Sequence, residues 1–216
     1  MSENNKVILE RFYVGMLQTN CYLIGDANTR QSVVIDPGGN SNEIAARIKK
    51  LDLDLVAILN THAHFDHIMA AWSLKESAGG TIYLHREDEP LIQDRTVGLG
   101  AVPSAIPDTS RRDIDRWLKE GDELKFGCIE LEVLETPGHS PGHVSFYFPK
   151  QKIIFVGDTL FAGSIGRTDF LGGSYDQLIR SVREKILSLD EATVVYPGHG
   201  PETTVGREKR TNPFFT

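Results

Sequence analysis

Short apolar runs separated by turn residues set the pattern of the chain. The run Leu55-Val56-Ala57-Ile58-Leu59 is bounded and short, which is typical of a buried strand. Alternating apolar positions predict two strands within 11–24, on either side of Gly15. Similar runs predict further strands over 32–36, 81–84, 124–126, 129–134, 144–148, 152–156 and 193–196.

Apolar positions three or four residues apart predict three helices. The first begins near Ser41, with Ser41 or Asn42 as its cap, the second follows His67, and the third covers 175–189. No internal repeat, low-complexity tract or linker divides the chain. We therefore expect one strand-rich α/β domain over residues 1–216. Residues 93–112 are the least regular part, and we interpret them as a lid or binding loop, a hypothesis that the sequence leaves open.

Composition limits the functions to consider. The 216 residues suffice for one sizeable core, and the hydrophobic (40%) and charged (25%) contents are those of a globular protein. A net charge of −7 without a long basic run argues against nucleic acid as a partner. Because there is neither a bilayer-spanning run nor a signal peptide, we expect no membrane partner and a cytoplasmic location. Cys21 and Cys128 are predicted to be free thiols, and the oligomeric state is left open.

The stretch Thr61-His62-Ala63-His64-Phe65-Asp66-His67 concentrates candidate metal ligands. It holds three of the seven histidines of the chain, between a predicted strand and a predicted helix. In an extended turn His62 and His64 project to the same side, because alternate residues do so. Asp66 and His67 then fall at the helix start, where free N–H groups favour a carboxylate. Imidazoles and carboxylates bind zinc and similar divalent metals, so we predict a metal site.

Three later turns bring further candidate ligands. His139, Asp158 and His199 each lie in a turn rich in glycine or proline after a predicted strand. Seven ligands are too many for one tetrahedral ion and suit two, zinc being expected and iron or manganese also suiting the set. We predict one ion on His62, His64 and His139, a second on Asp66, His67 and His199, and a bridge through Asp158. Open coordination positions would remain, as in a catalytic site.

Three other polar residues near strand ends have two interpretations each. His143 follows His139 by four residues, but Pro141-Gly142 intervenes, so we expect a supporting or an ordinary core histidine. Asp36 could hydrogen-bond toward the metal cluster or cap its own turn. His85 could join the cluster, although a purely structural role is the simpler interpretation.

The residues at 61–67, followed in order by His139, Asp158 and His199, resemble the signature of the metallo-β-lactamase superfamily. The resemblance extends over nearly the whole chain. It implies an αββα sandwich with the site at one edge, and it implies the ligand roles predicted above. Segments 157–161, 163–169 and 200–214 look like the glyoxalase II branch, and the chain is most similar to short bacterial hydroxyacylglutathione hydrolase-like proteins.

The substrate contacts of that branch are only partly present. Full-length glyoxalase II enzymes carry a C-terminal helical domain that contacts glutathione, and because this chain ends at Thr216 we expect that domain to be absent. The glutathione-contacting lysine and tyrosine of the family are replaced by Arg167 and residues 168–170. Arg167 could hold a substrate carboxylate, or it could pair with Asp169.

The expected reaction is hydrolysis of a small thioester such as S-lactoylglutathione. Two cations can lower the pKa of a shared water toward about 7 and so provide a metal-bound hydroxide. Asp66, the predicted catalytic residue, would orient that hydroxide, and the first ion would stabilise the oxyanion. A thiolate, with a pKa of about 8.5, leaves without a strong general acid. No lysine or tyrosine is evidently placed to protonate an amine, which disfavours β-lactams and peptides.

Three other functions compete with this one. A persulfide dioxygenase of the same superfamily uses one iron held by two histidines and one aspartate, and His62, His139 and Asp158 match that set. Two-metal sites also cleave phosphodiesters, but the nucleases of the superfamily carry large inserted modules for which this chain has no room. A non-catalytic metal-binding module is disfavoured by a complete ligand set with open positions.

Overall fold

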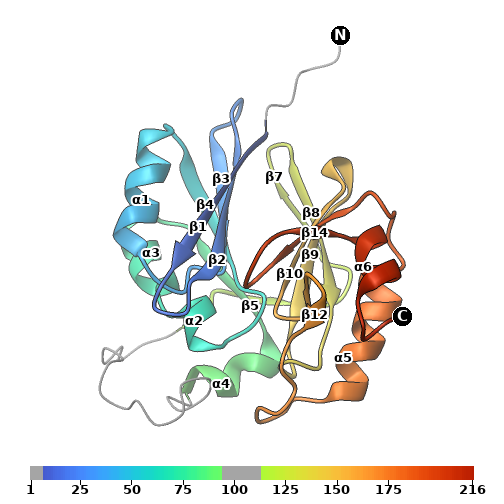
Figure 1. Ribbon diagram of the computed structural model, residues 1–216. Coiled ribbons are helices and arrows are strands. Elements are labelled where there is room, and N and C mark those ends of the chain that lie inside the picture. The colour runs from blue at the N-terminus through green and yellow to red at the C-terminus, as the bar shows by residue number, and fades with distance from the viewer. Residues whose placement is uncertain (1–6, 94–112) are drawn as a thin grey trace.

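Two six-stranded sheets, packed face to face, form the centre of the structure (Figure 1). The computed structural model describes residues 7–93 and 113–216. The N-terminal sheet has the order β1-β2-β3-β4-β5-β6, and its strands are β1 (Val7–Val14), β2 (Thr19–Asp26), β3 (Gln31–Ile35), β4 (Asp54–Leu59), β5 (Thr81–His85) and β6 (Arg116–Leu118). The C-terminal sheet has the order β14-β13-β10-β9-β8-β7, and its strands are β7 (Glu123–Phe126), β8 (Ile129–Glu135), β9 (Val144–Phe148), β10 (Ile153–Gly157), β13 (Val194–Pro197) and β14 (Thr203–Thr204).

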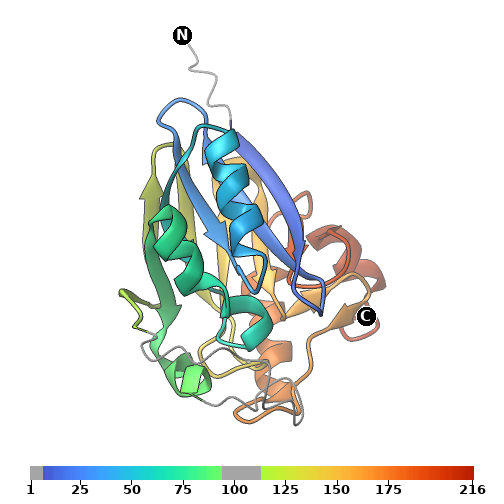
Figure 2. The same cartoon turned by 90° about the vertical axis from the view of Figure 1, so that its left-hand side faces the viewer.

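Helices cover the outer face of each sheet (Figures 1 and 2). On the N-terminal sheet lie α1 (Ser41–Lys50) and α3 (Ala71–Ala78), and on the C-terminal sheet lie α5 (Tyr175–Ser181), the π-helical turn η3 (Val182–Ile186) and α6 (Val205–Thr211). Shorter elements lie in the connections between these: α2 (Phe65–Ile68), η1 (Arg86–Asp88), α4 (Glu89–Gln93), η2 (Pro149–Gln151) and the small hairpin of β11 (Leu160–Phe161) and β12 (Ser164–Ile165). The architecture is therefore the αββα sandwich that the sequence analysis expected.

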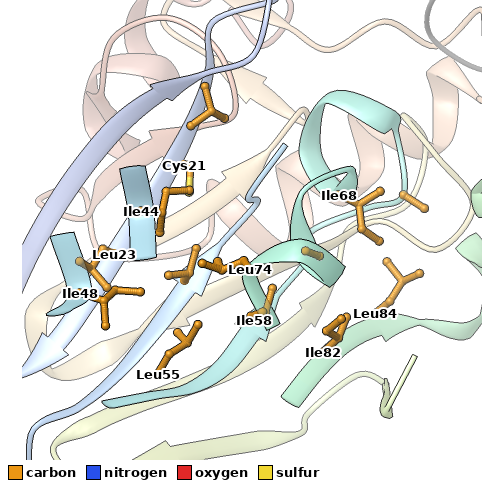
Figure 3. Close-up of a cluster of buried hydrophobic side chains, with 14 of the residues drawn as sticks. Cys21, Leu23, Ile44, Ile48, Leu55, Ile58, Ile68, Leu74, Ile82 and Leu84 are labelled. Atoms are coloured by element: carbon orange, nitrogen blue, oxygen red, sulfur yellow. The ribbon is translucent and has the colours of Figure 1, made fainter. Parts of the chain in front are cut away.

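Alternation along the strands explains why three apolar layers form. On β2, Leu23 faces α1 and α3, whereas Tyr22 and Ile24 face the other sheet, because neighbouring residues point to opposite faces. Figure 3 shows the outer layer of the N-terminal sheet, where Ile44 and Leu74 from the helices meet strand residues. The layer between the sheets contains four large aromatic residues that are almost fully buried: Tyr22, Phe146, Phe148 and Phe155.

Most of the predicted elements are present, and the differences lie at helix ends. The cap of α1 is Asn40, not Ser41 or Asn42, and Asn40 adopts a left-handed φ of 57°. Its side chain accepts from the N–H of Gly15 at 3.1 Å, so a contact between distant segments determines where the helix begins. The predicted helix over 175–189 ends earlier, in the turn η3. Strands β6 and β14, the small hairpin and α6 are additional.

Other expectations from the sequence can be compared with the described residues. Cys21 and Cys128 are free, as predicted. No helix in the described part of the chain is long and apolar enough to cross a membrane. Gln93 ends α4, and the rest of the predicted lid or binding loop, residues 94–112, lies outside the described residues.

Candidate metal centre

The register of parallel strands brings the predicted ligands to one edge of the sandwich. In the N-terminal sheet Ile35 of β3 pairs with Leu59 of β4, so Asp36 and the segment 60–67 begin side by side at the ends of their strands. In the C-terminal sheet β10 and β13 are parallel, with Gly157 beside Pro197, so residues 158 and 198–199 also lie side by side at their strand ends. His139 lies in the connection from β8 to β9. Five separate segments of sequence thus meet at this edge.

Candidate ligand atoms gather in three groups within the described residues. In each group the atoms lie within 4.8 Å of one another, and the groups are His62/His64/His139, Asp66/His67/His199 and Asp36/His62/His67. The first two coincide with the two groups that the sequence spacing predicted. Their assignment as metal ligands stays a prediction, because the geometry places the residues and does not identify what they bind.

Asp158 lies between the first two groups, which are called the first and second group below. Its Oδ2 lies 3.7 Å from Nε2 of His139 in the first group and 3.7 Å from Nε2 of His199 in the second. Its Oδ1 lies 3.5 Å from Nε2 of His67, also in the second group. A carboxylate in this position lies beside both groups, as the predicted bridge requires.

Asp36 holds two of the histidines through a buried network. Its carboxylate accepts from the N–H and the hydroxyl of Thr61, both at 2.7 Å, and from Nδ1 of His67 at 3.0 Å. Because the hydroxyl proton of Thr61 points to Asp36, its oxygen accepts from Nδ1 of His62 at 3.0 Å. Nε2 of both rings is therefore left to bind a cation. With three donors the Asp36 carboxylate is satisfied, so its position favours the supporting role over a simple turn cap, and the third group needs no ion of its own.

His139 and His64 complete the first group. Nδ1 of His139 donates to the carbonyl oxygen of Arg167 at 2.7 Å, which leaves Nε2 free in this ring as well. That nitrogen lies 2.8 Å from Nδ1 of His64. The rings of His62 and His139 meet edge to face, with centroids 4.8 Å apart. Three imidazoles thus present nitrogen atoms to one small buried volume.

Buried atoms without a hydrogen-bond partner indicate what this volume can bind. Among the described residues, Nε2 of His62 and His67 and Oδ1 of Asp158 are such atoms at the centre. A buried polar atom without a partner costs free energy, so a native site normally supplies one. Imidazole nitrogens and a carboxylate oxygen suit zinc, iron or manganese. The residues present therefore fit the predicted metal ions.

Burial keeps the first group neutral. It lowers the pKa of His62 well below its ordinary value and lowers the pKa of His64 to about 3, and neighbouring imidazoles add to both shifts. Burial also lowers the pKa of His139, although Asp158 opposes the shift. At neutral pH these rings carry lone pairs rather than additional protons, as metal binding requires.

The second group has more charge. Burial alone would lower the pKa of His67, but Asp66 and Asp158 raise it well above its ordinary value. Burial would likewise lower the pKa of His199, but the hydrogen bond between its Nε2 and Asp66, at 3.1 Å, raises it above the ordinary value. Burial alone would raise the pKa of Asp66, but His67 and His199 together lower it to about 2. Protons and cations therefore compete for these nitrogens, and binding of a metal would release protons.

Two residues that the sequence analysis did not single out support the second group. Thr19 donates its hydroxyl to Oδ2 of Asp66 at 2.9 Å. The neighbouring Asn20 donates its side-chain amide to the carbonyls of Pro197 at 2.9 Å and Gly200 at 2.8 Å, which surround His199. Both supporting residues begin β2. Thr19 meets Asp66 within the N-terminal half, whereas Asn20 meets Pro197 and Gly200 only because the two sheets pack together. Two polar residues at the start of a fully buried strand were the available signal.

The remaining histidines have other partners. Nδ1 of His143 lies 3.0 Å from the hydroxyl of Thr136, and its Nε2 accepts from the N–H of Asp158 at 3.2 Å. Both of its nitrogens are thus occupied, and the ring helps to place Asp158, in line with the expected supporting role. Nε2 of His85 lies 3.1 Å from Glu135, and His85 belongs to none of the three groups among the described residues.

Arg167 lies at the rim of the centre with its side chain already engaged. Its guanidinium makes two bonds to Asp169, at 2.9 and 2.7 Å, and lies 4.3 Å from the ring centroid of Phe170. That ring meets His64 edge to face at 5.0 Å. Of the two roles left open for Arg167, this arrangement favours the pair with Asp169.

Comparisons with known proteins agree with this geometry. The model of the Metallo-beta-lactamase superfamily matches residues 14–199. The chain is 40% identical over 214 residues to a protein of Haemophilus influenzae named hydroxyacylglutathione hydrolase GloC, a match that covers 96% of this chain and 97% of that protein.

Two solved structures share both the fold and a substantial part of the sequence. The B3 metallo-beta-lactamase BLEG-1 has a TM-score of 0.86 and 37% identity, covering 97% of this chain and 100% of that chain. TTHA1623, solved in a di-iron-bound form, has a TM-score of 0.81 and 42% identity, covering 95% and 99%. A chain similar to this one thus binds two iron ions.

Proposed function

The chain belongs to the metallo-β-lactamase superfamily, and we propose that within it the protein hydrolyses small thioesters such as S-lactoylglutathione. The name of the Haemophilus influenzae relative supports this substrate class, since the similarity extends over nearly the whole of both chains. The observation that carries the proposal is the position of Asp158, 3.7 Å from both His139 and His199, which suits a two-metal hydrolytic centre. Zinc is the proposed metal, and a cytoplasmic location and a small-molecule partner are parts of the same proposal.

The residues of the chain would divide the work as follows. When bound, divalent cations supply Lewis acidity, which makes water more acidic and polarises the substrate carbonyl. The first group would hold one cation and the second group the other. Asp66, held by Thr19 and His199, would orient the attacking water by accepting a hydrogen bond from it. His143 would keep Asp158 in place through its bond to the backbone N–H.

A thioester fits the groups at the rim of the centre. A cysteine thiol has a pKa of about 8.5, so a thiolate of this kind can leave without a strong general acid. The aromatic side chains of Phe161 and Phe170, which contact His199 and His64, would exclude water beside the acyl group. The thiol carrier would extend past the exposed side chain of Arg167, which is paired with Asp169, and this favours tolerance of several carriers.

A second candidate function is oxidation of a persulfide at a single iron. Such a mononuclear site needs two histidines and one aspartate. His139 and Asp158 lie 3.7 Å apart, Nε2 to Oδ2, and the ring of His62 is adjacent. The iron bound by TTHA1623 adds a reason to test it. The similarity to a B3 metallo-beta-lactamase likewise makes a β-lactam part of the test.

The experiment compares substrates on protein loaded with zinc, with iron or with manganese. Thiol release would be followed with S-lactoylglutathione and with an S-acyl thioester of a different carrier, beside hydrolysis of a β-lactam and of a phosphodiester. Oxygen uptake with glutathione persulfide would be recorded on the same preparations. Chelator-treated protein serves as the control.

We expect thiol release that depends on metal and exceeds turnover of the β-lactam and the phosphodiester. Oxygen uptake without thioester cleavage would contradict the proposal in favour of the dioxygenase. Faster cleavage of the β-lactam would contradict the substrate class while leaving the metal centre in place.

A further inference from the structure

One buried carboxylate outside the candidate ligands joins the two segments that carry the first group. Asp88 ends η1, directly after β5, and its side chain is fully buried. Its Oδ2 accepts from the N–H of Ala63 at 3.0 Å and from the hydroxyl of Ser140 at 2.8 Å. Its Oδ1 accepts from the N–H of Gly142 at 2.6 Å. All three donors lie in turns of the metal centre.

The positions of these donors relative to the ligands are specific. Ala63 lies between His62 and His64, so a bond to its N–H constrains the backbone of both. Ser140 follows His139 directly. His62 and His64 follow a strand of the N-terminal sheet, and His139 follows a strand of the C-terminal sheet. One carboxylate therefore holds together the parts of the first group that come from different sheets.

The turn packs directly against Asp88, with no room for a side chain at Gly142. A Cβ atom on Gly142 would lie 2.7 Å from the backbone nitrogen of Asp88 and 2.8 Å from Nδ1 of His85. Burying a carboxylate is costly unless donors satisfy it, and here three donors do so. The second group depends on different supports, namely Thr19 for Asp66 and Asp36 for His67. Loss of Asp88 should therefore affect the two groups unequally.

We propose that Asp88 is a positioning residue for the first group: it keeps His62 and His64 in place relative to His139, and it touches neither the ion nor the substrate. The inference rests on the metal binding in the proposed function. Removing a support of a metal ligand typically lowers metal affinity by about 10- to 100-fold. We expect Asp88→Asn to weaken one ion by that factor, because an amide offers one acceptor oxygen and adds donors beside N–H groups.

Asp26 provides a closely matched control. It is 1% exposed and, like Asp88, it accepts two backbone N–H groups and one hydroxyl. Its donors are the N–H of Asn28 at 2.8 Å, the hydroxyl of Thr29 at 2.7 Å and the N–H of Cys128 at 2.9 Å. Cys128 precedes β8, so Asp26 also joins the two sheets, at the ends of its strands remote from the candidate ligands. Asp26→Asn removes an equivalent network without touching the metal centre.

The test measures zinc affinity by competition with a chromophoric chelator for wild type, Asp88→Asn, Asp26→Asn and Ser140→Ala. We expect two ions of unchanged affinity in Asp26→Asn, and one ion weakened about 10- to 100-fold in Asp88→Asn with the other unchanged. Ser140→Ala removes a single bond and keeps the carboxylate, so it should weaken the same ion by a smaller factor while the protein stays folded.

Equal affinities in Asp88→Asn and Asp26→Asn, or equal weakening of both ions in Asp88→Asn, would overturn the inference. If Asp88→Asn does not fold, unchanged zinc binding in Ser140→Ala overturns it and selective weakening supports it. No substrate enters this experiment. Absence of thioester hydrolysis would therefore contradict the proposed function alone, whereas unchanged zinc affinity would contradict the role of Asp88 alone.

Discussion

Gly198 lies so close to Asp158 that a Cβ atom on it would clash with Oδ1 of that carboxylate. The same atom would lie 2.6 Å from Cε1 of His67. The glycine before His199 is therefore required by the width of the centre, because no side chain fits between the strand end and the ligands.

The first prediction follows from this contact. Gly198→Ala should push Asp158 or His67 out of place and weaken zinc binding, with overpacking that costs about 1–3 kcal/mol in stability. Gly206→Ala is the control, since its Cβ would meet Glu191 at 2.9 Å, away from the centre. Urea denaturation and zinc titration of both variants check the expectation. Normal zinc affinity in Gly198→Ala would show that the centre has more room than its geometry indicates.

A second prediction concerns the bridge. Asp158→Ala should weaken both ions and lower thiol release by more than about 100-fold, beyond the loss typical of a supporting residue. His199→Ala should loosen mainly the ion of the second group, because His199 belongs to that group and contacts Asp66. Elemental analysis after dialysis distinguishes the two patterns. Retention of two ions and of near-normal turnover in Asp158→Ala would rule out the bridge.

The pH dependence of stability should reveal the Asp26 network. Burial raises the pKa of Asp26, but the bonds from Thr29, Asn28 and Cys128 lower it to about 2. Because the folded pKa lies below the unfolded value of about 3.9, the group stabilises the protein by about 2 kcal/mol above pH 4 and loses this as pH falls toward 2. The difference in unfolding free energy between wild type and Asp26→Asn should shrink by about half between pH 6 and pH 3. A difference that stays constant over this range would contradict the lowered pKa.

A fourth prediction addresses Arg167. Its side chain is 66% exposed and its guanidinium is paired with Asp169 rather than left to bind a substrate, so Arg167→Ala should change KM for S-lactoylglutathione by less than about fivefold. Its carbonyl, which holds His139, is untouched by the substitution. Asp169→Ala should have a similarly small effect. If KM instead rises tenfold or more in Arg167→Ala at unchanged kcat, the guanidinium binds the carboxylate of the thiol carrier.

Local sequence could predict the candidate ligands because each lies where a recognisable strand ends. His62 and His64 alternate in an extended turn, and Asp158 and His199 follow short apolar runs, so periodicity and turn residues placed each of them at the end of a strand. Their meeting at one edge followed from the family resemblance, as did the sandwich layers.

The supports of those ligands could not be predicted in the same way. Thr19, Asn20 and Asp88 act on residues that are distant in sequence, so their contacts form only in the folded chain. Those of Asn20 with Pro197 and of Asp88 with Ser140 also require one sheet to lie on the other. Helix ends were missed for the same reason, since Asn40 begins α1 by bonding to Gly15. Nothing in the local pattern of these residues encodes the partner.

The most direct test of the account counts the ions that thioester cleavage needs. Metal-free protein would be titrated with zinc while loss of the thioester bond of S-lactoylglutathione is followed, and elemental analysis would give the ions bound at each point. We predict that turnover rises until two ions are bound per chain and then stays constant. A plateau at one ion per chain, or full occupancy by two ions without thioester cleavage, would contradict the account.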